Sequence, residues 1–231
     1  MKSIILAALY VLVASCTFGQ KSLGIKIYQN TDLFSIEYRE WGNSKPTVSE
    51  EVNFNRISLA ASLQTKSKFV HEVELFIPEI SKPLDKIQYP MNYELRRDET
   101  FDGEVSSYSF RYEFSKTFTD DTKRLGFGLG AGINPYYVHI EYIPNVETTF
   151  YFSSRLYGFV VNVTPRISYR LSNRFSIDLN VPLKIYDLRW EKIRVDNPAI
   201  PITQQTVTTL DNIFFEDAYT IRLGVMYTLT K

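Results

Sequence analysis

The chain has 231 residues, and its 26 Lys and Arg residues are balanced by 26 Asp and Glu residues. This balance argues against electrostatic binding of nucleic acid. Cys16 is the only cysteine, so the remainder of the chain supports neither a disulfide framework nor a thiolate metal site. Aromatic residues make up 15% of the chain, a share that suits a protein at a membrane–water interface.

The N-terminus has the three parts of a secretory signal. A basic start is followed by an apolar run over residues 4–15 and by small or polar residues up to Gln20. This pattern predicts a cleavable signal peptide over residues 1–19, because the run is shorter than the roughly 20 residues of a spanning helix. An alternative is that residues 13–16 form a lipoprotein box, with Cys16 carrying a lipid. Residues 20–231 then form one domain.

Apolar and polar residues alternate in eight segments after the signal. Such alternation predicts β-strands with one apolar and one polar face. A change of phase in the first segment predicts a bulge or break near Asn30 and Thr31. Pro165 and Pro182 each remove a backbone donor, which predicts a bulge or local break at both places. The segments cover residues 23–41, 52–64, 68–78, 104–118, 123–142, 157–171, 175–190 and 214–230.

The connections between these segments alternate in length. Short turns follow the second, fourth and sixth segments, whereas long polar connections include residues 79–103 and 191–211. No segment after residue 20 is able to cross a membrane as a helix, so a membrane protein of this sequence must be a closed sheet. We predict an all-β fold, an eight-stranded antiparallel up-and-down transmembrane β-barrel with both termini at the periplasmic end. A secreted lipocalin-like binding barrel is the alternative.

The polar faces of the segments carry charges of both signs. Eight strands leave a lumen wide enough only for side chains, and an unpaired buried charge costs several kcal/mol. We therefore predict a paired charge network that plugs the lumen, with a proton or ion path as the alternative. Its predicted members are Arg56, Glu72, Glu74, Arg111, Glu113, Arg166, Arg170, Asp178, Lys184 and Arg222.

Two further groups of residues have both a structural and a functional interpretation. Gly126, Gly128, Gly130 and Gly132 fall on the lumen face, where they leave room for long arginine side chains from neighbouring strands; the alternative is a ligand groove. His139, Glu141 and Ser153 fall near the extracellular rim, with Ser153 opposite Glu141. They are the catalytic candidates for a second hypothesis, a lipid-modifying enzyme of the lipid A acyl hydrolase type. The sequence indicates no cofactor and no metal ligand cluster.

The C-terminal segment carries a specific alternating motif. Arg222, Gly224, Tyr227 and Leu229 resemble the C-terminal signal by which outer-membrane barrels are recognised for assembly, although Thr230 and Lys231 replace the usual terminal aromatic residue. Over residues 22–231 the chain resembles the small outer-membrane β-barrel proteins of Gram-negative bacteria, the group similar to the membrane domain of outer membrane protein A.

This resemblance implies a monomeric outer-membrane protein with a plugged lumen and a structural or surface-binding role through its extracellular loops. It brings no catalytic motif, so the leading hypothesis is a non-enzymatic barrel. The expected partners are outer-membrane lipid, the barrel assembly machinery and an extracellular ligand that the sequence does not identify. A narrow, porin-like channel is left open.

Overall fold

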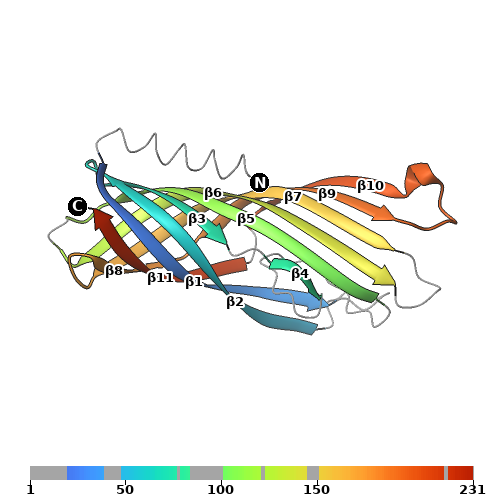
Figure 1. Ribbon diagram of the computed structural model, residues 1–231, viewed down its shortest axis with the longest axis horizontal. Helices are drawn as coiled ribbons and strands as arrows, with labels where there is room; N and C mark the ends of the chain where they lie inside the picture. The colour runs from blue at the N-terminus through green and yellow to red at the C-terminus, as the bar shows by residue number, and fades with distance from the viewer. Residues whose placement is uncertain are drawn as a thin grey trace.

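The structure, a computed structural model, describes residues 20–38, 48–76, 79–83, 101–120, 123–144, 151–215 and 218–230. They form a closed antiparallel barrel of eight strands (Figure 1). The strand segments are β1 (Gln20–Tyr38), β2 (Val48–Thr65), β3 (Phe69–Phe76), β4 (Glu79–Pro83), β5 (Phe101–Thr117), β6 (Leu125–Pro144), β7 (Phe152–Arg170), β8 (Phe175–Asn180), β9 (Leu183–Val195), β10 (Thr206–Phe214) and β11 (Ala218–Thr230).

Eleven segments make eight strands because some segments are successive parts of one strand. β8 and β9 are the two halves of the seventh strand, and both pair with β7. β10 and β11 are the two halves of the eighth, where β10 pairs with β9 and β11 pairs with β8. The short β4 pairs with β5. The barrel closes between β1 and β11, from Leu23 opposite Thr230 to Phe34 opposite Ala218.

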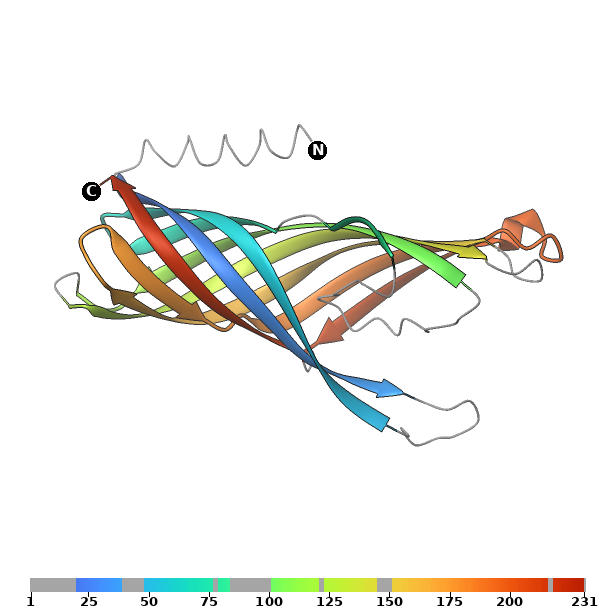
Figure 2. The same ribbon diagram turned by 60° about the horizontal axis from the view of Figure 1, so that its bottom comes forward.

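The two ends of the barrel differ. One end, called here the short-turn end, holds the turns between β2 and β3, β5 and β6, and β7 and β8, together with both ends of the described chain. The opposite end is called the loop end. There, Figure 2 shows β1 and β2 diverging from β9 and β10. The two ends therefore present different surfaces, a compact rim and a set of projecting hairpins.

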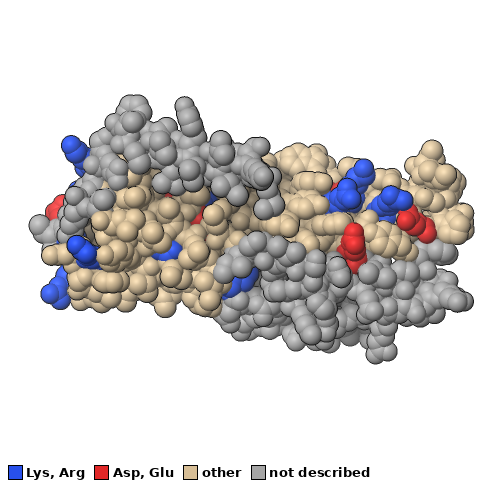
Figure 3. Space-filling view, in the orientation of Figure 1, with Lys and Arg blue, Asp and Glu red and all other residues tan. Residues whose placement is uncertain are grey.

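Burial in this barrel is inverted relative to a soluble protein. Among the described residues, 17 buried side chains are polar or charged and eight are hydrophobic. Large apolar side chains such as Ile27, Leu129 and Leu223 are instead about half exposed on the outer face. The half with the short turns shows a mostly uncharged surface in Figure 3. An apolar outside and a polar inside are typical of a barrel surrounded by lipid.

An aromatic row crosses four neighbouring strands on the outer face. Tyr108 on β5 lies opposite Tyr137 on β6, which lies opposite Tyr157 on β7, which lies opposite Trp190 on β9. The ring centroids of Tyr137 and Tyr157 are 4.9 Å apart. Tyr and Trp gather where a membrane meets water, so this row marks the boundary of the apolar belt on the loop side.

The loop-end segment predicted as a long connection over residues 191–211 is instead mostly a β-hairpin. β9 runs on to Val195, a short 3₁₀ turn covers Ile202–Gln204, and β10 begins at Thr206. The β-branched residues Thr206, Val207, Thr208 and Thr209 favour an extended strand. The prediction was wrong because the polarity of these residues is typical of a loop, although their β-branched side chains favour a strand.

The predicted bulge near Asn30 and Thr31 is also wrong. Asn30 pairs with Arg56 and Thr31 with Asn55 in unbroken register, and the shifts lie at the start of β1. The prediction took the change in the apolar alternation as a break in the strand. It was wrong because apolar residues need not face outward along the whole length of a strand. In the loop half of the lumen, Val138, Ile140 and Leu156 are buried. The N-terminal segment is therefore one strand.

The two strand prolines behave differently. The break predicted at Pro182 is confirmed, since β8 ends at Asn180 and β9 begins at Leu183. The break predicted at Pro165 is wrong, because Pro165 keeps its place opposite Leu129. Its carbonyl accepts from the Val181 N–H at 3.3 Å. In an antiparallel strand the N and C=O of one residue point to the same side. The nitrogen of Pro165, which has no hydrogen to donate, therefore points to the side where β8 and β9 are already interrupted at Pro182.

Candidate functional site

Eight charged side chains meet in the middle of the lumen, and this set is called the lumen network. Its positive and negative members are equal in number, so the formal charges cancel. Each member is buried or nearly so, with side chains no more than 9% exposed. The members are Lys26, Glu72, Glu74, Arg111, Glu113, Arg166, Asp178 and Arg222.

Glu72 is the centre of one half of the lumen network. The Lys26 Nζ lies 2.6 Å from Glu72 Oε2 and 2.8 Å from Asp178 Oδ2. The Arg166 guanidinium donates to both Glu72 oxygens, at 3.0 and 3.2 Å. The Tyr28 hydroxyl donates to Asp178 at 2.7 Å. These groups come from β1, β3, β7 and β8, so the contacts cross the whole lumen.

Arg222 is the centre of the other half. Its Nη2 lies 2.5 Å from Glu74 Oε2, and its Nε and Nη1 donate to Asn30 at 3.0 Å and to Asn180 at 2.6 Å. The guanidinium also stacks over the Tyr28 ring, 4.0 Å from its centroid. Each face and edge of this buried cation is therefore matched by a partner, which is what a charge removed from water requires.

Glu113 joins the two halves into one network. It accepts from Arg166 Nη2 at 2.8 Å and lies 3.4 Å from Arg111 Nη2. Arg111 in turn lies 3.3 Å from Glu74. On β2, Ser58 donates to Glu74. The lumen is thus crossed by a continuous set of ion pairs and hydrogen bonds to which seven of the eight strands contribute side chains.

The one remaining strand, β6, contributes space instead of side chains. A Cβ added at Gly130 would lie 2.7 Å from Glu113 Oε1, and one at Gly132 would lie 3.6 Å from the Glu113 Cβ. Gly224 on β11 has the same role beside the Tyr28 ring, which a Cβ would overlap. These glycines leave the volume that the network occupies. The neighbour at Gly130 is a glutamate, whereas the sequence interpretation expected arginines.

Seven of the ten predicted network residues meet in this structure, and three lie elsewhere. Arg56 stacks 4.9 Å from the Phe76 ring centroid. Lys184 is half-buried on β9, and Arg170 lines a cavity at the short-turn end. Sequence reasoning missed Lys26, Tyr28 and Asn30. Their spacing of two on β1 was the available signal, since alternate residues of a strand share a face.

The loop half of the lumen is built differently from the network. It buries Tyr136, Val138, Ile140, Leu156 and Val160. Polar groups interrupt this apolar lining at two places. Asp187 accepts from the Tyr136 hydroxyl at 2.8 Å and from Arg189 at 2.7 and 2.9 Å, and the buried Ser154 donates to Glu191 at 2.7 Å. The lumen therefore changes from charged to mostly apolar along its length.

The catalytic candidates lie on the outer face near the loop end. Ser153 is opposite Glu141, as the sequence predicted, and the His139 Nε2 lies 3.4 Å from Glu141 Oε1. Within the described residues, no hydrogen bond joins Ser153 to His139. Burial and the Glu141 carboxylate raise the pKa of the Tyr151 phenol, which bonds to that carboxylate. Glu141 thus has a second partner, and the trio does not form the relay that a serine nucleophile needs.

The residues of the C-terminal motif have structural partners. Arg222 and Gly224 face the lumen as described. Tyr227 packs against Phe175, with ring centroids 5.1 Å apart, and Leu229 is about half exposed on the outer face.

Elsewhere on the outer face, the His71 Nδ1 lies 2.9 Å from the Tyr112 hydroxyl. The described residues contain no cluster of His, Cys, Asp and Glu that would hold a metal ion, and no helix among them is long and apolar enough to cross a membrane.

The fold is similar to solved structures of outer-membrane proteins. The outer membrane protein OprG from Pseudomonas aeruginosa superposes with a TM-score of 0.58, at 12% sequence identity, over 93% of this chain and 99% of that one. The fold is that of a small outer-membrane β-barrel. Outer Membrane Protein W of E. coli, seen by NMR in solution, also matches, with a TM-score of 0.47 and 11% identity over 90% of this chain and 98% of that one. No protein-family model and no curated protein matches the barrel sequence.

Proposed function

We propose that the barrel lies in a bacterial outer membrane, reached through a cleaved signal at residues 1–19, with its short-turn end in the periplasm. Its lumen is sealed, and it serves as a scaffold that displays binding hairpins outside the cell. The lumen network supports the seal, because paired and hydrogen-bonded charges fill the cross-section from nearly every strand. A bilayer of this kind accepts barrels with short periplasmic turns and longer outer loops.

Single-channel recording in planar bilayers tests the seal. We expect the wild-type barrel to show no conductance above the membrane baseline at neutral pH. The double variant Arg166→Ala, Glu72→Ala removes both partners of a central pair, and we expect it to conduct small ions. Arg194→Ala is the matched control, since Arg194 is 61% exposed at the loop end. Steady wild-type conductance equal to that of the double variant would contradict the seal.

The hairpin of β9 and β10 supports the display role. Among the described residues, β10 pairs only with β9, so one edge of β10 offers unpaired backbone groups. Val207, Leu210 and Phe214 are each more than half exposed. A strand edge with apolar side chains is a template for adding a strand from another chain. This surface is the strongest candidate for binding an extracellular ligand.

Cysteine labelling on intact cells tests the location and orientation. The chain beyond Cys16 has no cysteine, so a single engineered thiol gives a clean signal. We expect Thr208→Cys on β10 to react with a membrane-impermeant maleimide on intact cells. Thr119→Cys at the short-turn end is the matched control, and it should react only after the outer membrane is permeabilised. The reverse pattern would overturn the orientation.

A further inference from the structure

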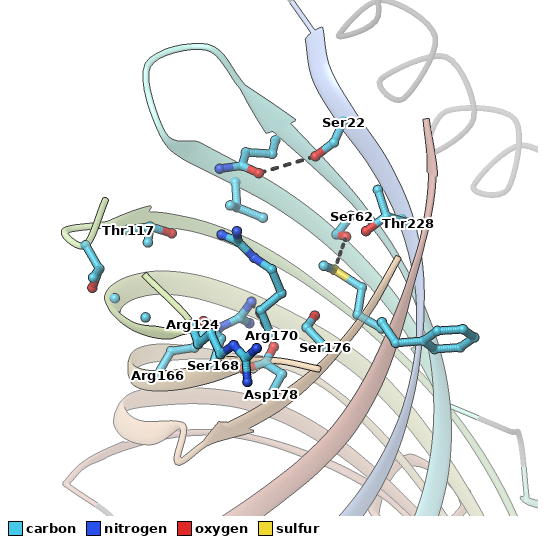
Figure 4. Close-up of a pocket in the computed structure, with 18 of the residues that line it drawn as sticks. Ser22, Ser62, Thr117, Arg124, Arg166, Ser168, Arg170, Ser176, Asp178 and Thr228 are labelled. Atoms are coloured by element: carbon cyan, nitrogen blue, oxygen red, sulfur yellow. Dashed lines mark hydrogen bonds and ion pairs between the residues drawn. The ribbon is translucent and has the colours of Figure 1, made fainter. Parts of the chain in front are cut away.

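A cavity of about 410 Å³ opens at the short-turn end, and its inner end lies against the lumen network (Figure 4). Lys26, Arg166 and Asp178 of the network form its floor, and the turn residues surround its mouth. In Figure 4, Arg124, Ser168 and Arg170 lie together on one wall, while Ser22, Ser62 and Thr228 lie on the other. The cavity is therefore a polar vestibule closed at the bottom.

The charge of this cavity is not balanced as the network is. Besides the floor residues, its lining contains four cations, Lys123, Arg124, Arg170 and Arg174, and one carboxylate, Asp120. Asp120 is held at 2.9 Å by Lys68, which lies outside the lining. Within the described part of the chain, Arg124 and Arg170 form no ion pair. Unlike the neutral network at its inner end, the vestibule carries a surplus of positive charge.

The backbone fixes two of these cations next to one another. The Arg170 N–H donates to the Arg124 carbonyl at 2.8 Å. This bond ties the end of β7 to the start of β6, so both guanidinium groups start from one point on the wall. Two guanidinium forks at one place suit an anion with several oxygens, since each fork makes two parallel hydrogen bonds.

Hydroxyl groups and glycines complete the lining. The walls offer hydroxyl donors from Ser115, Thr117, Ser168 and Ser176. On β6, Gly126 and Gly128 have no side chain that would enter the cavity. A Cβ at Gly126 would lie 2.6 Å from the Ser168 Oγ, so a larger residue would fill this part of the vestibule. The glycine run therefore has two roles, because Gly130 and Gly132 accommodate Glu113 and the other two keep the vestibule open.

We propose that the vestibule is a binding site for a phosphate-type oxyanion, with Arg124 and Arg170 as its main ligands. The apolar belt around the vestibule lowers the dielectric constant of its walls and strengthens the positive field inside. The lumen network as a whole is neutral and closes the inner end of the vestibule, so the anion does not pass into the lumen. A free phosphate or pyrophosphate and the headgroup of an anionic phospholipid share the required chemistry.

Calorimetry with pyrophosphate tests the proposal, using the full barrel in nanodiscs of zwitterionic lipid. We expect saturable binding that weakens as salt is raised. Arg124→Gln and Arg170→Gln should each weaken it by roughly tenfold or more, because each removes a fork whose charge-assisted hydrogen bonds contribute at least that factor. Arg170→Lys keeps the charge but loses the fork, and should give a smaller loss. Arg155→Gln is the matched control, because Arg155 is exposed on the outer face of the same strand, and its affinity should equal that of the wild type.

A second arm distinguishes the two sources of the anion. Nanodiscs with phosphatidylglycerol should weaken pyrophosphate binding if the headgroup occupies the vestibule, and leave it unchanged if the natural ligand is soluble; either result supports the site. The arginine Nε–H signals of the wild-type protein, followed by NMR during titration, give a readout that needs no variant. The absence of saturable binding, or an equal loss in Arg155→Gln, would overturn the proposal.

Discussion

The lumen network and the β9–β10 hairpin are opposites in almost every physical respect. The network buries Arg222 completely and holds it with hydrogen bonds to Asn30, Asn180 and Glu74. The hairpin exposes nearly all of β10 and leaves one of its edges unpaired among the described residues. A buried, mutually dependent set of charges tolerates little change, whereas an exposed strand tolerates much.

This difference separates the residues that stabilise the barrel from those to which we assign binding. Because the network members come from six of the eight strands, each of these strands must be in register before the charges are paired. The network therefore selects one closed arrangement. The hairpin extends beyond the aromatic row and shares little with the network, so its surface is able to change without disturbing the closure.

Arg222→Met should have the largest effect of any single change. It removes the partner of the buried Glu74 and leaves the Asn30 and Asn180 amides without their donor. We expect the free energy of unfolding to fall by about 3 kcal/mol, the lower end of the range for breaking a buried pair, because Arg111 still lies 3.3 Å from Glu74. Urea unfolding in lipid vesicles, followed by tryptophan fluorescence, measures the loss.

Arg194→Met is the control for that measurement. Arg194 pairs with Asp196 at 2.8 Å, but both side chains are well exposed. An exposed pair contributes about 0–1 kcal/mol. If the two variants lost equal stability, the contrast between the network and the loop end would not hold.

Gly224→Val tests the volume that the network needs. The added side chain would overlap the Tyr28 ring, which supports both Arg222 and Asp178. Overpacking of this kind costs about 1–3 kcal/mol, again read from urea unfolding. Thr228→Val is the control, because Thr228 lies on the same face of β11 as Gly224 and faces the open vestibule. A comparable loss of stability in that variant would argue against a steric cause.

The sequence predicted the barrel but not the details that distinguish its two ends. Strand period, alternating connections and the charges of Glu72, Glu74, Arg111 and Glu113 are local signals, and they sufficed for eight strands. The partner of each charge depends on register across the lumen, which no local pattern encodes. Lys26 was missed because the apolar residues beside it drew attention to the other face of β1.

The hairpin was missed for a related reason. Thr206, Val207, Thr208 and Thr209 have the shape of strand residues, but they show no apolar face because both faces of β10 meet solvent. Alternation reports a strand only where the two faces have different surroundings. A projecting hairpin has no such difference, so propensity was the only signal available for it.

Leu210→Asp on β10 should have a small effect on stability. Leu210 is 57% exposed, and it lies opposite Trp190. We expect the free energy of unfolding to change by less than about 0.5 kcal/mol, while binding of an extracellular strand to the hairpin is weakened. A loss as large as that of Gly224→Val would show that the hairpin and the barrel unfold as one unit.

Asp120 at the short-turn end should show the smallest effect, a local one that depends on pH. The hydrogen bond and charge of Lys68 hold the pKa of Asp120 below its ordinary value of 3.8. A carboxylate whose pKa is lowered by folding stabilises the folded state above the unfolded pKa, and that contribution is lost as pH falls through the folded pKa. The turn should therefore loosen only below about pH 4. NMR titration of the Asp120 carboxyl carbon measures this, and Lys68→Met should return its pKa toward 3.8; an unchanged pKa in that variant would show that the ion pair is not its cause.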